Sequence, residues 1–96
     1  MDKVERAQML FDALDDRATT EGLELIDVEV KGQTHSPIVV VYLHKDDGIG
    51  IDDLTVANKW IDTVLDELIT TRYTLEVSSP GGRAKRNTTE NTNEAN

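Results

Sequence analysis

Apolar residues recur along the chain at two spacings, three to four residues in some segments and two residues in others. Over residues 3–20 the longer spacing predicts one stripe of an amphipathic helix, formed by Val4, Ala7, Leu10, Phe11, Leu14 and Ala18. Gly22 follows at a position where glycine commonly ends a helix. The pattern therefore predicts a first helix that stops just before Gly22.

Two strands are predicted after this helix. Residues 23–30 alternate between apolar and polar positions, and one face is expected to consist of Ile26, Val28 and Val30. Residues 38–45 contain a β-branched run, which is the strongest strand signal in the chain. Because polar and turn residues separate the two segments, we expect them to pair as a hairpin.

A second amphipathic helix is predicted to begin at Ile51, after a turn that contains two glycines. Gly50 is an acceptable N-cap, and Asp52 and Asp53 place negative charge in the first turn, where the helix dipole favours it. Trp60 lies at the border of the apolar stripe and is expected to pack in the core or at its edge. The stripe itself consists of Leu54, Ala57, Ile61, Val64, Leu65 and Leu68.

Residues 73–77 alternate again and predict a third strand. The order helix, strand, strand, helix, strand favours an α+β fold, a two-layer α-β-β-α-β sandwich with both helices on one face of a three-stranded sheet. The other face of the sheet is then uncovered. From the alternation, the uncovered face is expected to carry Leu25, Asp27, Glu29, Val40, Tyr42, Thr74 and Glu76.

The charge of the chain is negative and unevenly spread. The formal net charge is -9, and residues 1–80 hold 7 Lys and Arg against 17 Asp and Glu. A field of this sign repels phosphate backbones and favours basic protein partners. Residues 82–96 contain no aliphatic residue larger than alanine, so we expect them to form a disordered polar tail.

Other features exclude several classes of protein. The chain has no cysteine, which fits a cytoplasmic location, and it has neither a secretory h-region nor an apolar run long enough to span a membrane. No nucleophile and base are paired and no phosphate-binding glycine loop is present, so we expect no enzyme and no cofactor. A metal role is disfavoured for the acidic and histidine residues that invite one. The aspartates do not have the spacing of an EF-hand loop, and neither histidine has a cysteine or second histidine at ligand spacing. These residues are Asp46, Asp47, Asp52, Asp53, His35 and His44.

Three strings carry a resemblance to a known family. Residues 73–81 read YTLEVSSPG, residues 22–30 read GLELIDVEV, and residues 41–53 read VYLHKDDGIGIDD. In this order they resemble the N-terminal domain of the bacterial ribosome maturation factor RimP. The resemblance implies an N-terminal-type domain over residues 1–81 and a binding role in small-subunit assembly. The family's second, Sm-like domain has no counterpart in residues 82–96.

The resemblance and the charge pattern together indicate a partner-binding surface. We expect the uncovered sheet face and the turn after the third strand to dock on immature small ribosomal subunits, contacting a basic ribosomal protein, while the basic residues after the turn contact rRNA phosphates. A dimer through the same face is an open alternative. The expected binding residues are Asp27, Glu29, Tyr42, Glu76, Ser78, Ser79, Pro80, Gly81, Arg83, Lys85 and Arg86.

Interpretations in which the same residues have no binding function stay open. Ser78 to Gly81 is also an ordinary strand-ending turn, the basic residues after it also serve solvation, and the sheet face can be an ordinary exposed surface. The fold has some likeness to KH modules, but the GXXG loop that grips nucleotides there is missing. The functional alternative is therefore a stand-alone acidic interaction or regulatory domain that keeps the fold without binding ribosomes.

Overall fold

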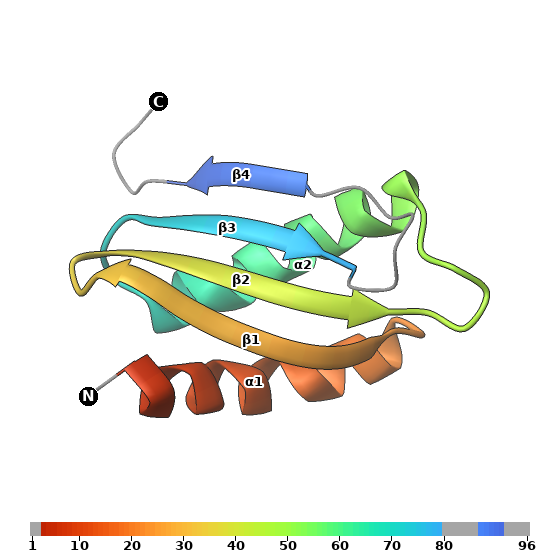
Figure 1. Ribbon diagram of the computed structural model, residues 1–96, viewed down its shortest axis with the longest axis horizontal. Helices are drawn as coiled ribbons and strands as arrows, with labels where there is room; N and C mark the ends of the chain where they lie inside the picture. The colour runs from red at the N-terminus through yellow and green to blue at the C-terminus, as the bar shows by residue number, and fades with distance from the viewer. Residues whose placement is uncertain (1–2, 80–86, 92–96) are drawn as a thin grey trace.

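The computed structural model describes residues 3–79 and 87–91. Within these ranges two helices and four strands follow one another (Figure 1). They are α1 (Lys3–Thr20), β1 (Glu24–Gln33), β2 (Ser36–His44), α2 (Ile51–Leu68), β3 (Tyr73–Ser78) and β4 (Asn87–Asn91). The expected α+β class and the order α-β-β-α-β are confirmed for the first five elements.

The four strands form one mixed sheet in the order β1-β2-β3-β4. β1 and β2 are an antiparallel hairpin, as expected, whereas β2 and β3 run parallel. A parallel pair needs a crossover connection, and α2 supplies it. The crossover places β3 alongside residues 38–42 of β2, with Ser78 at the end of β3 level with Tyr42.

β4 departs from the expectation for the C-terminal segment. We expected residues 82–96 to be disordered, but residues 87–91 form a strand that pairs antiparallel with β3. The lack of apolar side chains predicted disorder for the segment, whereas strand pairing needs backbone groups alone, and the outer edge of β3 offers them. The rest of that segment lies outside the described residues.

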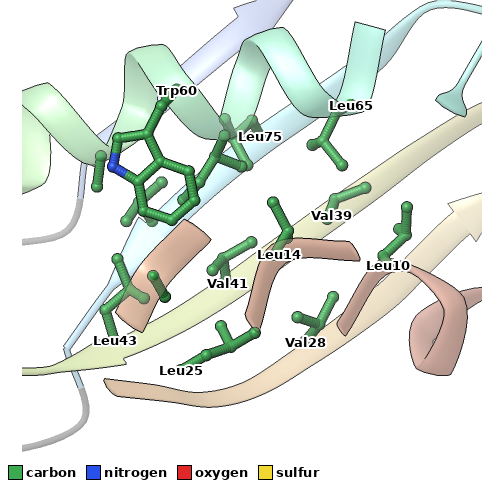
Figure 2. Close-up of a cluster of buried hydrophobic side chains, with 14 of the residues drawn as sticks. Leu10, Leu14, Leu25, Val28, Val39, Val41, Leu43, Trp60, Leu65 and Leu75 are labelled. Atoms are coloured by element: carbon green, nitrogen blue, oxygen red, sulfur yellow. The ribbon is translucent and has the colours of Figure 1, made fainter. Parts of the chain in front are cut away.

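Both helices pack on the same face of the sheet. One cluster of buried side chains joins Leu10 and Leu14 of α1, Leu65 of α2, and residues of all three longer strands such as Val39 and Leu75 (Figure 2). Trp60 is 4% exposed and belongs to this cluster, so the core role expected for it is confirmed.

A β-bulge changes the facing of residues at the start of β1. The register with β2 shifts between Leu25 and Asp27, so Ile26 has no direct partner. Leu25 is consequently buried at 6% exposure in the core, and Ile26 is 42% exposed. Both expectations for these two residues are wrong, because the extra residue of a bulge reverses which side chains before it face the core.

The ends of the helices follow the sequence signals. Gly22 has a φ of 80° and ends α1, while the Leu23 N–H donates to the Ala18 carbonyl at 2.8 Å in the pattern of a Schellman motif. At the start of α2, the Asp53 carboxylate accepts the Gly50 N–H at 3.0 Å. That hydrogen bond is the main cause that lowers the pKa of Asp53 below its usual value, with help from the ammonium of Lys45.

Candidate partner-binding face

The sheet surface opposite the helices carries five of the six described side chains that are expected to bind a partner. Its residues lie in three rows across β1, β2 and β3, because the strand registers place them side by side. We call this surface the open face, and it consists of Asp27, Tyr42 and Ser78 in one row, Glu29, Val40 and Glu76 in the next, and Lys31, Ile38 and Thr74 in the third.

Val40 forms the centre of the open face. It is only 2% exposed, yet it is not part of the cluster beneath the helices. Its partners across the sheet are Glu29 and Glu76, and its neighbours on the same side of β2 are Ile38 and Tyr42. The long side chains around it therefore cover it, and the open face has a small apolar centre with an acid on either side.

The acids of the open face are held in place by hydrogen bonds. The Tyr42 hydroxyl donates to Glu29 Oε1 at 2.8 Å, and Lys31 Nζ lies 3.6 Å from the same oxygen. Asp27 Oδ1 accepts the Val28 N–H at 2.9 Å. These contacts order the aromatic ring and two carboxylates before any partner arrives, which reduces the entropy that binding must overcome.

The turn after β3 lies only partly within the described residues. Ser78 is level with Tyr42 in the same row, and Ser79 follows it; both are partly exposed. The structure thus brings together Asp27, Glu29, Tyr42, Glu76 and Ser78. The other expected binding residues, Pro80, Gly81, Arg83, Lys85 and Arg86, lie outside the described residues.

Sequence reasoning missed two residues of the open face. Lys31 lies on β1 beyond the predicted end at Val30, and Ile38 begins the row next to Val40. The alternation of Asp27 and Glu29, continued by two residues, places Lys31 on the same face. Ile38 belongs to the same alternating set as Val40 and Tyr42, so its spacing was already a sufficient signal.

A second polar cluster lies on the helix side of the sheet. The Tyr73 hydroxyl lies within hydrogen-bond distance of carboxylate oxygens of Asp62 and Asp66, one turn apart on α2, and its distance to Asp66 Oδ1 is 2.8 Å. Burial and these two acceptors raise the pKa of the Tyr73 phenol far above its ordinary value. The phenol stays protonated and fastens the start of β3 to α2, which is a structural role.

Two kinds of site have no candidate in residues 3–79 and 87–91. Within these ranges no three His, Asp or Glu residues gather closely enough to hold a metal ion. Neither described helix has the length and apolar character needed to cross a membrane.

The chain matches one known protein family. The match is to the RimP N-terminal domain and covers residues 13–83, well over half of the 96 residues. It spans β1, β2, α2 and β3, which are the elements that build the open face. This family is one of ribosome maturation factors and is not an enzyme class. The chain belongs to the RimP N-terminal domain family.

Proposed function

We propose that this domain acts in the maturation of the small ribosomal subunit in the cytoplasm, by docking transiently on immature subunits through its open face. The observation that carries the proposal is the surface itself. An ordered tyrosine and a buried valine lie among Asp27, Glu29 and Glu76 on a family-defining scaffold. Family membership supports ribosome maturation as the setting, and the composition of the face supports a basic ribosomal protein as the contact.

The proposed contact rests on electrostatic attraction between the acidic open face and a basic surface of the partner. Interfaces commonly have an apolar centre and a polar rim, and Tyr is enriched in them. Val40 and Tyr42 provide the centre, and the carboxylates around them select for Lys and Arg on the partner. Complementary charge speeds encounter and excludes acidic partners, while the small apolar area keeps the complex short-lived.

The turn after β3 extends this surface in the proposal. Ser78 adds a hydroxyl group next to Tyr42, and Ser79 follows it in the chain. Hydroxyls form hydrogen bonds with either phosphate or backbone groups. In the sequence Pro80 and Gly81 come next, and Arg83, Lys85 and Arg86 follow them with positive charge suited to rRNA phosphates.

Sucrose-gradient sedimentation of a cell lysate tests this function. The wild-type chain, followed by antibody, is expected to migrate with free small subunits at low salt and to leave them at moderate salt, because rim charges are screened. Tyr42→Ala removes the aromatic ring and leaves Glu29 without its hydroxyl donor, so it is expected to reduce migration with the subunits. Ser79→Ala is expected to reduce it less.

A control keeps the result interpretable. Asp16→Asn changes an exposed acid of α1, on the helix side of the molecule, and is expected to sediment like the wild type. If the wild-type chain stays at the top of the gradient at every salt concentration, then the ribosome-docking function is refuted and a stand-alone interaction domain takes its place.

A further inference from the structure

β1 forms one border of the sheet. Among the described residues no strand pairs with its outer edge, whereas the opposite border strand, β4, occupies the outer edge of β3 (Figure 1). β1 is also the longest strand, with 10 residues. An edge of this length presents backbone groups to which another extended chain can add.

The hydrogen bond of Val28 shows how the backbone of this edge is oriented. The Val28 N–H donates to the Asp27 carboxylate of its own strand at 2.9 Å. In an antiparallel pair, every second residue directs its N–H and C=O away from the partner strand. Val30 shares this orientation with Val28, two residues before it, so both offer backbone groups to the outer edge.

A groove runs beside the same edge. Residues of β1 and of the N-terminal half of α1 line a surface hollow of about 380 Å³. Its apolar lining comes from Val4, Ala7 and Phe11 of the helix and from Val28 and Val30 of the strand. Val4 is 79% exposed, which is unusual for a residue on the apolar stripe of a helix. An extended chain added to β1 would turn every second side chain into this groove.

An added strand would direct the side chains between these away from the groove, and the charges beside the groove determine which residue types fit there. Asp27 and Glu29 also line the groove, and they belong to the open face, where the remaining side chains of an added strand would lie. Lysine or arginine at those positions would lie across from the two carboxylates. Lys3 and Lys31 at the far end of the groove disfavour further basic residues there.

We propose that the outer edge of β1 and the groove beside α1 bind an extended segment of a basic partner protein, in which aliphatic residues alternate with lysine or arginine. The segment adds to the sheet as a fifth strand. Its aliphatic side chains fill the groove, and its cationic side chains pair with Asp27 and Glu29. A carbonyl of the segment replaces the Asp27 carboxylate at the Val28 N–H, which frees that carboxylate for an ammonium or guanidinium group.

A second copy of this chain fits the edge less well. Pairing of two β1 strands about a two-fold axis centred on Val28 would set Asp27 of each copy opposite Glu29 of the other. Like charges directly across a pair of strands are destabilising, and each copy carries a net charge of -9. The charges therefore favour a basic partner over self-association.

Titration of the full chain with a synthetic peptide of alternating lysine and valine tests this inference. Backbone amide NMR signals report the site, and the expected result is saturable binding with the largest shifts at Val28 and Val30. A peptide with the same composition in blocks, and one of alternating glutamate and valine, are expected to bind at least about tenfold more weakly, since neither places both side-chain types correctly.

Variants separate the groove from the open face. Ala7→Met fills the groove with a helix-compatible side chain and is expected to abolish the shifts. Asp27→Asn with Glu29→Gln keeps both hydrogen-bond acceptors and removes two charges, and it is expected to weaken binding about five- to tenfold. Asp15→Asn with Asp16→Asn removes two charges from exposed positions of α1 that do not line the groove, and it is the matched control, expected to bind like the wild type.

The inference is overturned if the peptide does not bind to the folded chain or if Ala7→Met binds as well as the wild type. It is also overturned if the shifts centre on β3 and Glu76→Gln weakens binding as much as the paired Asp27→Asn and Glu29→Gln change does. The assay contains no ribosomal component, so its outcome does not depend on the proposed function. Loss of ribosome docking with intact peptide binding, or the reverse, would distinguish the two.

Discussion

The side chain of Tyr73 both fills part of the core and connects β3 to α2. Its ring is buried between β3 and α2, and its hydroxyl lies against Asp62 and Asp66. The two carboxylates lie one turn apart on the helix, and a proton donor between them reduces their mutual repulsion. The alternation of β3 predicted that this tyrosine faces the core. It did not reveal the acids, because they belong to an element that packs against β3 only in the folded chain.

Tyr73→Phe is expected to lower the free energy of unfolding by about 1.5–3 kcal/mol at neutral pH, the usual contribution of a hydrogen bond to a charged group. The raised pKa adds a pH dependence. The contribution of the phenol is fully present below the tyrosine pKa of the unfolded chain, about 10, and declines above it, because only the unfolded chain then releases the proton. Urea unfolding at neutral and alkaline pH measures both effects.

The control for this prediction is Tyr42→Phe, which changes a partly exposed tyrosine and leaves Tyr73 intact. It is expected to keep the alkaline loss of stability of the wild type, whereas Tyr73→Phe is expected to show a smaller loss. Equal alkaline losses in both variants would contradict the role given to the Tyr73 phenol.

At the scale of elements, β1 shows where alternation succeeds and where it fails. From Asp27 onward the facing of residues is as the pattern predicts, because the register with β2 is regular. Before it, the bulge exchanges the environments of Leu25 and Ile26. No turn residue or glycine marks this bulge in the sequence. Only pairing with β2 shows that Leu25 lies opposite Leu43, so its burial could not be predicted.

The bulge makes a clear prediction for stability. Leu25→Ala is expected to cost about 2–5 kcal/mol, because it leaves a cavity in the core. Ile26→Ala is expected to change the free energy of unfolding by less than about 1 kcal/mol, since the side chain is largely exposed. Denaturant unfolding followed by the fluorescence of Trp60, the single tryptophan, measures both. The opposite ranking would mean that regular alternation holds and that β1 has no bulge.

At the scale of the whole molecule, the two-layer arrangement and the charge distribution determine which surfaces form the core and which are left for partners. The sequence predicted both helices on one side of the sheet, because each has one apolar stripe and each needs the same core. That arrangement leaves one sheet face and one strand edge for partners. The predicted acids of the open face could be found from strand alternation alone. The groove beside β1 could not be predicted in this way, because its shape depends on how α1 packs against the edge strand.

The open face as the docking surface is the central claim, and one comparison of affinities tests it most directly. A fluorescently labelled chain is titrated with purified immature small subunits, and the dissociation constants of Glu76→Gln and Glu67→Gln are compared with the wild type. Both variants remove one carboxylate, from the open face in the first case and from exposed α2 on the other side in the second. The account predicts binding about two- to fivefold weaker for Glu76→Gln and unchanged for Glu67→Gln. Equal effects of the two variants, or no effect of either, would contradict it.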